Sequence, residues 1–179
     1  MVRDAAVVRV LDGPSAWAAI GELTGVLIDC VERGASVSFM SPLSRDRAEA
    51  FWGDVVEGVA KGDRILLAAE AAGRIVGTVQ VVLAGPENQP HRADVAKMLV
   101  HGGARRQGLG EALMRAAEAA ALAAGRTLLV LDTVTGGDAE RLYARLGWVR
   151  VGVIPDYALW PDGRPCDTTV LFKNLTNLR

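Results

Sequence analysis

The sequence predicts a single α/β domain in which a mixed β-sheet carries helices on both faces. Segments with strand-like and helix-like hydrophobic periodicity follow one another in the order β-α-α-β-β-β-α-β-α-β-β. The 179 residues are half hydrophobic, which is enough for one substantial core. No repeat or linker divides them, so residues 1–179 are expected to form one domain.

The N-terminal third predicts one strand and two helices. A strand is expected over residues 6–11, and a turn rich in glycine and proline ends it. Apolar residues then recur at three- and four-residue spacings up to residue 33, which predicts one helix capped by Ser15. After an apolar, irregular stretch over residues 36–43, a second helix is expected over residues 44–61.

The middle of the chain predicts three neighbouring antiparallel strands. Residues 64–70 and 74–83 should form a hairpin, because a short turn containing glycine separates them. A further strand over residues 91–100 carries Asp94 and Lys97, whose spacing of three breaks the alternation of a regular strand. This break predicts a β-bulge or a functional strand.

The C-terminal part predicts a crossover helix and further strands. A helix over residues 109–124 leads to a strand at 127–131 whose almost wholly apolar sequence is typical of a strand covered on both faces. The strand–helix–strand unit that ends there should be parallel. The remaining segments are expected to be a short helix, a strand, a long connection and a last strand, over residues 139–146, 148–154, 155–165 and 166–173.

Composition excludes several classes of function. A net charge of −1 and a pI near 6.1 indicate no basic surface for nucleic acid, and no uninterrupted apolar stretch is long enough to span a bilayer. His91 and His101 are too few histidines for a typical zinc site, and Cys30 and Cys166 lack metal-ligand spacing. We therefore expect a cytoplasmic protein that binds no metal, nucleic acid or membrane.

A glycine-rich turn between the strand at 91–100 and the next helix predicts an anion site. The first amide groups of such a helix lack partners and lie at the positive end of its dipole. Gly108 and Gly110 carry no Cβ atom that would hold a phosphate away from the backbone, and Arg105 and Arg106 add positive charge. The turn is therefore predicted to cradle a diphosphate.

Two segments match motifs of one enzyme superfamily. The run Arg105-Arg106-Gln107-Gly108-Leu109-Gly110 fits Arg/Gln-x-x-Gly-x-Gly/Ala, and residues 139–148 fit Ala-x-x-Leu-Tyr-x-x-x-Gly-Phe/Trp. With the order of elements, they make the chain resemble the GNAT superfamily of acyl-CoA-dependent N-acetyltransferases, most strongly over residues 64–154. Residues 93–100 and Leu131-Asp132-Thr133 look closest to the tabtoxin-resistance-type branch, whose members acetylate small molecules.

The resemblance implies the GNAT fold, a mixed and mostly antiparallel sheet of about seven strands, and acetyl-CoA as co-substrate. Backbone amides from Gln107 to Ala112 would hold the diphosphate, and the backbone of residues 98–100 would pair with the pantetheine arm like an added strand. The cofactor-binding residues expected on this basis are Met98, Leu99, Val100, Arg105, Arg106, Gln107, Gly108, Leu109, Gly110, Glu111 and Ala112. The implied acceptor is a primary amine of a small molecule. Because relatives are often dimers, a homodimer with a contact from residues 155–165 and the last strand is a further expectation.

The resemblance also implies a division of the chemistry. Tyr143 would protonate the leaving thiolate as general acid, and a backbone amide in residues 98–100 would stabilise the oxyanion. The ammonium of the acceptor must lose a proton before it attacks. Asp94 ranks first as the base because it lies on the suspected bulged strand, Asp132 ranks second, and Glu70 is a third carboxylate.

Each of these roles has a structural alternative. Tyr143 could be a core aromatic residue. Asp94 could be an ion-pair partner of Arg92 or Lys97, and Asp132 could cap the turn that follows it.

The chain departs from the superfamily at two places. Gly136 stands where many members carry Asn, and Gly102-Gly103 stands where relatives often carry larger or basic residues. Both changes remove side chains near the expected cofactor site. The change at Gly136 mildly supports a non-catalytic acyl-CoA-binding module as an alternative function. A protein or peptide N-acetyltransferase stays open within the enzyme class. A nucleotide-binding α/β protein ranks last, because the chain has no Gly-x-x-x-x-Gly-Lys-Ser/Thr motif.

Overall fold

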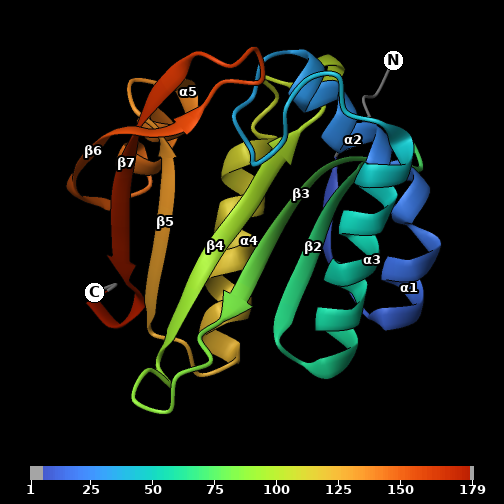
Figure 1. Ribbon diagram of the computed structural model, residues 1–179. Helices are drawn as coiled ribbons and strands as arrows, with labels where there is room; N and C mark the ends of the chain where they lie inside the picture. The colour runs from blue at the N-terminus through green and yellow to red at the C-terminus, as the bar shows by residue number, and fades with distance from the viewer. Residues whose placement is uncertain (1–5, 178–179) are drawn as a thin grey trace.

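The computed structural model describes residues 6–177 and folds them around one seven-stranded sheet (Figure 1). In chain order the strands are β1 (Val7–Leu11), β2 (Arg64–Ala71), β3 (Arg74–Leu83), β4 (Arg92–Val100), β5 (Leu128–Val134), β6 (Val149–Leu159) and β7 (Pro165–Asn174). Their spatial order is β1-β2-β3-β4-β5-β7-β6. All neighbours are antiparallel except β4 and β5, which are parallel, so the predicted mixed sheet is confirmed.

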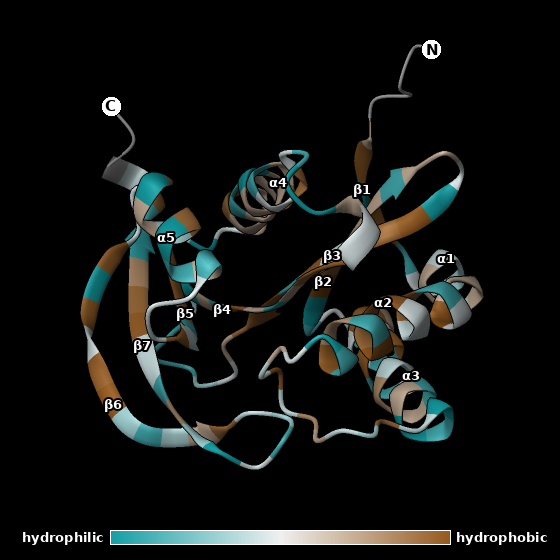
Figure 2. Ribbon diagram, turned by 90° about the horizontal axis from the view of Figure 1, so that it is seen from above, coloured by the Kyte–Doolittle hydropathy of each residue, from teal (hydrophilic) through white to brown (hydrophobic). Residues whose placement is uncertain are grey.

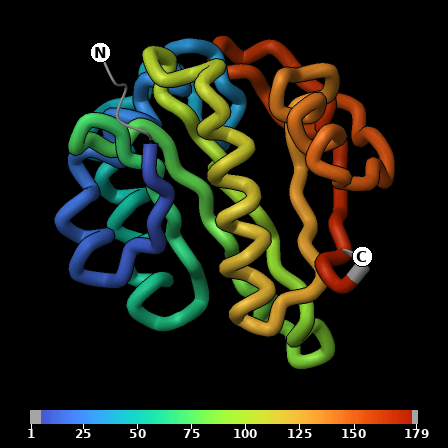
Figure 3. The backbone as a smooth tube through the Cα atoms, turned by 180° about the vertical axis from the view of Figure 1, so that it is seen from behind, coloured from blue at the N-terminus to red at the C-terminus, as the bar shows by residue number. Residues whose placement is uncertain are grey.

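Helices cover both faces of this sheet (Figure 2). One face carries α1 (Gly13–Ala18), α2 (Ile20–Glu32) and α3 (Arg45–Lys61), and the other carries α4 (Leu109–Ala123) and α5 (Asp138–Arg145). Seen from behind, α4 runs along the middle of the sheet, where it packs on β2, β3 and β4 (Figure 3).

Alternate residues of β2 pack into two separate cores. Leu67 and Ala69 belong to the cluster beneath α4, whereas Leu66 and Ala68 belong to the cluster beneath α2 and α3. A strand that is buried on both faces needs apolar residues at successive positions, and this explains the apolar run of β2. The two cores hold the central strands from both sides and so fix the positions of the strand ends.

The expected first helix is divided into two. Asp12, not Ser15, caps α1, because its Oδ1 accepts a hydrogen bond of 2.9 Å from the Ser15 amide. At Ala19 the amide bonds to carbonyls both three and four residues earlier, which tightens the last turn of α1 before α2 begins. By contrast α3 begins after Ser44 and ends at Gly62, which has a φ of 79°, as expected.

The expected bulge in the strand at 91–100 is present in β4. Its pairing with β3 shifts by one residue between Thr78 and Gln80, and Lys97 opposite has a φ of 50°. Gly77 marks a close approach of backbone, since a Cβ atom there would lie 3.0 Å from the Leu99 carbonyl oxygen. The bulge therefore places Lys97 and Met98 out of register with the rest of the strand.

The C-terminal hairpin is longer than predicted. Residues 155–165 were expected to connect two strands, but β6 continues to Leu159 and β7 begins at Pro165. The pairing shifts by two residues between Ile154 and Ala158, and Pro155 lies inside this irregularity. A proline is tolerated there because no ladder hydrogen bond is required of it. The Asp156 amide bonds instead to Asp167 Oδ1, at 3.0 Å.

Candidate active site

The parallel strands β4 and β5 separate soon after they begin. Only Arg92, Ala93 and Asp94 of the described β4 residues pair with β5, opposite residues 128–130 (Figure 1). Beyond this point the edge of β4 that faces β5 carries backbone groups without a neighbouring strand. A cleft of about 1020 Å³ lies there.

The cleft brings most of the predicted site residues together. Its walls include Met98, Leu99, Val100, Arg105, Arg106, Gly108, Leu109, Gly110, Glu111, Asp132 and Tyr143. Four predicted residues are not part of these walls: Gln107, Ala112, Asp94 and Glu70, the last of which pairs with Arg9 of β1. Side chains that the motifs did not identify also line it, among them Cys30, Arg33, Lys97 and Thr168.

The start of α4 forms one end of the cleft, where the sequence predicted an anion site. Gly108 has a φ of 81°, and a Cβ atom there would meet nothing within 4 Å, so its surroundings are open. The amides at the start of the helix have no acceptor within it. Ala112 is an exception among the residues predicted to hold the diphosphate. Its amide already bonds to the Gly108 carbonyl at 3.0 Å and is not available to a ligand.

The second glycine of the motif has a packing contact that the sequence did not predict. A Cβ atom at Gly110 would lie 3.0 Å from Leu142 Cδ2. The absence of that atom lets α4 approach α5 closely, at a position that also lines the cleft.

The two arginines of the turn differ in their contacts. Arg105 donates through Nε to the Val100 carbonyl at 3.1 Å, and its Nη2 lies 3.9 Å from the Cys30 sulfur. Its side chain thus fastens the turn to the end of β4 and to α2. Arg106 has a φ of 60° and an exposed side chain at the cleft, which suits it to contact an anion directly.

The first glycine of the pair before the motif, Gly102, lies close to residues of α2 and its C-terminal cap. The Gly102 amide donates to Asp29 Oδ2 at 2.7 Å, and a Cβ atom at Gly102 would lie 2.2 Å from Arg33 Nε. Burial alone would raise the pKa of Asp29, but hydrogen bonds from Arg33 and Gly102 outweigh it and lower the pKa. A larger residue at 102 would displace Arg33 from this anchor.

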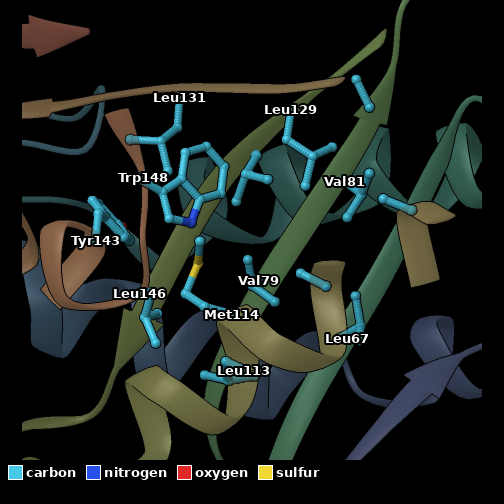
Figure 4. Close-up of a cluster of buried hydrophobic side chains, with 14 of the residues drawn as sticks. Leu67, Val79, Val81, Leu113, Met114, Leu129, Leu131, Tyr143, Leu146 and Trp148 are labelled. Carbon is cyan, nitrogen blue, oxygen red and sulfur yellow. The ribbon is translucent and has the colours of Figure 1, made fainter. Parts of the chain in front are cut away.

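Tyr143 lies at the inner wall of the cleft. It is 6% exposed, and its ring centroid lies 6.0 Å from that of Trp148 with the planes tilted by 51° (Figure 4). Burial, and to a smaller extent the charge of Asp132, raise the pKa of the phenol. The phenol therefore keeps its proton throughout the neutral range, as a general acid must.

The two candidate bases occupy different places. Asp94 accepts a 2.6 Å hydrogen bond from Arg92 Nη1 and its side chain is 44% exposed, so the ion pair allowed by the sequence is formed. Asp132 lies inside β5, opposite Val170, and does not follow the strand as a turn cap. Its side chain lines the cleft, and its charge acts on Tyr143. The order of preference is therefore reversed, with Asp132 ahead of Asp94.

Lys97 lines the cleft, although the sequence predicted it only as a possible ion-pair partner of Asp94. Its Nζ lies 3.1 Å from Ser38 Oγ and 5.8 Å from the centre of the Phe51 ring. Burial lowers the pKa of Lys97, the charge of Asp132 opposes this effect, and Arg64 adds to it. In the sequence, Lys97 was marked by its break in the alternation of the strand. The bulge in β4 explains that break.

The apolar stretch at 36–43 contributes a second wall. Residues 36–40 line the cleft together with Asp132 and Tyr143, and the stretch is tied to the β6–β7 hairpin. Ser36 Oγ donates to the Leu159 carbonyl at 2.7 Å, and the Ser41 amide donates to the Pro161 carbonyl at 3.1 Å. These bonds join α2, the stretch and the hairpin around the cleft.

Within residues 6–177, no three His, Cys, Asp or Glu side chains are grouped closely enough to hold a metal ion. In the same part of the chain, no helix is both long and apolar enough to cross a membrane.

Comparison with known proteins adds a family and a set of similar folds. Residues 61–150, just over half of the chain, match the acetyltransferase (GNAT) domain family. An N-acetyltransferase from Staphylococcus aureus Mu50 has a TM-score of 0.79 at 15% identity, over 96% of this chain and 99% of that one. A ribosomal-protein-alanine N-acetyltransferase from Brucella melitensis has a TM-score of 0.79 at 20% identity, over 94% and 99%.

A third similar structure was solved with a ligand. It is a GNAT superfamily phosphinothricin acetyltransferase from Sinorhizobium meliloti in complex with acetyl-CoA, with a TM-score of 0.79 at 17% identity over 95% of this chain and 88% of that one. At these identities the likeness to all three proteins is one of fold.

Proposed function

The chain belongs to the GNAT acetyltransferase domain family, and we propose that it transfers the acetyl group of acetyl-CoA to the primary amine of a small molecule. One observation carries this proposal. A single cleft combines the open start of α4, the unpaired edge of β4, a carboxylate at Asp132 and a protonated phenol at Tyr143. One site can therefore bind a thioester that carries a diphosphate, take a proton from the amine and give a proton to the thiolate.

The cofactor end would hold acetyl-CoA mainly through backbone groups. The amides at the start of α4, from Gly108 to Glu111, and the Arg106 guanidinium suit the diphosphate. The free edge of β4 at residues 98–100 suits the amides of the pantetheine arm. The phosphinothricin acetyltransferase that shares this fold was solved with acetyl-CoA, which supports the same occupant here.

The chemical step would be direct attack in a ternary complex. The amine nitrogen forms a bond to the acetyl carbon, Asp132 takes the proton that the nitrogen loses, and the carbon–sulfur bond breaks. Tyr143 gives its phenolic proton to the departing thiolate and then regains one from solvent. A backbone amide at the bulge of β4 would stabilise the oxyanion while the bonds change.

A small acceptor is favoured over a protein because the acceptor side of the cleft is bridged. The bonds from Ser36 and Ser41 join residues 36–43 to the β6–β7 hairpin. This leaves less room for an extended peptide than an open groove would. The resemblance of residues 93–100 and 131–133 to the tabtoxin-resistance-type branch supports the same class of acceptor.

Two finer expectations stay predictions. Exposed Tyr157 and Leu159 lie in the β6–β7 hairpin, where the sequence placed a homodimer contact, and size-exclusion chromatography with light scattering would test it. A cytoplasmic location would keep the buried Cys30 and Cys166 as free thiols, as they are here.

Thiol release from acetyl-CoA tests the proposal. The acceptors should include phosphinothricin, the free amino acids, simple polyamines and a short peptide with an N-terminal alanine. We expect release with at least one small amine and slower release with the peptide. Faster release with the peptide would reassign the acceptor class. Tight binding of acetyl-CoA with no release for any amine would identify a non-catalytic module instead.

A further inference from the structure

A buried ion pair lies behind the wall of the cleft that carries Tyr143. Lys173 of β7 and Glu118 of α4 have side chains that are 7% and 9% exposed, and Lys173 Nζ lies 2.7 Å from Glu118 Oε2. Neither residue lines the cleft. Ion pairs this deeply buried are costly to form, and each member makes further hydrogen bonds that offset the cost.

Those further bonds lead to the end of α5. Lys173 Nζ also donates to the Leu146 carbonyl at 2.7 Å, and Glu118 Oε1 accepts from Trp148 Nε1 at 3.0 Å. Leu146 and Trp148 in turn donate their amides to the Tyr143 carbonyl, at 3.1 and 3.0 Å. Both residues held by the ion pair are therefore bonded to the backbone of Tyr143.

The helix that carries Tyr143 depends on such an anchor. It has eight residues, and Tyr143 is its one buried member. A helix this short is not stable alone and is held in place by tertiary contacts. The Lys173 ammonium lies at its C-terminal end, where the helix dipole favours a cation. On the other side, the ring of Tyr143 packs on the Trp148 indole that Glu118 holds (Figure 4).

We propose that Glu118 and Lys173 are positioning residues for catalysis, which set the place of the Tyr143 phenol in the cleft by fixing the C-terminal end of α5 and the ring of Trp148. The inference rests on the proposed function, because it requires that Tyr143 act as the general acid. Glu118 and Lys173 lie outside the cleft, yet the proposal gives them an effect on the rate of acetyl transfer. It predicts that this effect depends entirely on Tyr143.

A double-mutant cycle on kcat tests the proposal, with the amine that gives the fastest thiol release as acceptor. Tyr143→Phe alone should lower kcat about a hundredfold. The charge-balanced variant Glu118→Gln with Lys173→Met leaves no unpaired buried charge and should lower kcat about tenfold, with the KM for acetyl-CoA nearly unchanged. Added to Tyr143→Phe, the same pair of changes should lower kcat by less than about twofold, because the acid it positions is already absent.

Three results separate the possibilities. If the paired change lowers kcat equally with Tyr143 and with Phe at 143, its effect is general and the positioning role is wrong. If Tyr143→Phe leaves kcat unchanged, the general-acid assignment in the proposed function fails first. The matched control is Lys61→Met, which removes an exposed lysine paired with Glu57 on α3 and should leave kcat unchanged.

Loss of fold must be separated from loss of position. Each variant is therefore assayed well below its own Tm, and the amide-exchange rates of Leu146 and Trp148 are compared with the parent protein. We expect faster exchange at these two amides in the paired variant while the amides of β2 stay protected. Unchanged exchange at Leu146 and Trp148 would overturn the proposal independently of activity.

Discussion

The two ends of the cleft are built in different ways. The end near α4 is made of backbone: a turn with two left-handed residues, a helix start and a strand edge. The other end is made of side chains from β4, β5, α5 and the stretch at 36–43. In the proposed function, the first end takes a chemical group that every acyl-CoA shares, whereas the second distinguishes one acceptor from others. A general ligand can be held by backbone, but selectivity needs side chains.

Because of this difference, we expect ligand binding at the end near α4 to be the more sensitive to a change in the shape of the backbone turn. Gly108→Glu places a carboxylate where the diphosphate should lie, in a turn with a φ of 81°. Losing about two charge-assisted hydrogen bonds should weaken acetyl-CoA binding by about 10²–10³-fold, measured by titration calorimetry.

A matched glycine lies at the other end of the same helix. Gly125 has a φ of 74° and also has nothing within 4 Å, so Gly125→Glu carries a similar backbone strain away from the cleft. Acetyl-CoA binding should be retained in this variant. Equal losses of affinity in both variants would mean that strain, not the site, is being measured.

The side-chain end is tested by its carboxylate. Asp132→Asn should lower kcat/KM about a hundredfold, because the amide cannot accept the proton of the acceptor ammonium. The loss should be greatest at low pH, where most of the amine is protonated.

Asp94→Asn is the matched comparison on the neighbouring strand. Its carboxylate is paired with Arg92 at 2.6 Å and lies outside the cleft walls, so kcat/KM should change by less than about twofold. A larger loss for Asp94→Asn than for Asp132→Asn would restore the order that the sequence suggested.

The same difference decides what the sequence could predict. The turn at 105–110 and the segment at 139–148 are local patterns, and a local pattern is enough when backbone makes the site. The side-chain end depends on which residues a strand presents after a bulge. Asp94 and Lys97 looked alike in the sequence, but the register shift places Lys97 in the cleft and leaves Asp94 outside it. Only the three-dimensional pairing of β3 with β4 determines this.

Glycines show the same limit within a motif that was otherwise identified correctly. Gly108 has the open surroundings that the motif implies, but a Cβ atom at Gly110 would lie 3.0 Å from the side chain of Leu142, which is 32 residues away in the sequence. A Cβ atom at Gly102 would likewise lie 2.2 Å from Nε of Arg33, at the end of the first helical region. Long-range packing of this kind leaves no periodic trace in a single sequence. The division of the first helix at Ala19 and the length of β6 were also missed, because the apolar periodicity runs through Ala19 and Pro155 favoured an end of the strand at residue 154.

Lys97 gives a smaller effect, on stability. Burial lowers the pKa of Lys97 in the folded protein. Below this lowered pKa the amine is charged in both states, and the charge is less favourable in the folded protein than in the unfolded chain, which reduces the free energy of unfolding. As pH rises through the folded pKa toward the ordinary value, this reduction disappears. Lys97→Met should therefore raise Tm relative to the parent by more at pH 7 than at pH 10, with a change of a few degrees at about neutral pH.

Lys61→Met is the control for this pH dependence, because Lys61 is exposed on α3 and no cleft group surrounds it. Its Tm difference from the parent should be nearly the same at pH 7 and pH 10. A difference for Lys97→Met that grows with pH would mean that the folded protein favours the charged form of Lys97.

The smallest expected effect concerns the place where the two ends meet. Gly110→Ala adds a Cβ atom 3.0 Å from Leu142 Cδ2, and Leu142 immediately precedes Tyr143 on α5. If Gly110 serves packing, the extra atom should displace α5 slightly, so kcat should fall by about threefold while the Kd for acetyl-CoA stays within about twofold of the parent. Gly110→Ala with Leu142→Val should recover much of the lost rate, because the shorter side chain makes room. A loss of acetyl-CoA affinity that Leu142→Val does not relieve would instead return Gly110 to the diphosphate, and the two ends of the cleft would then be less distinct than their contacts indicate.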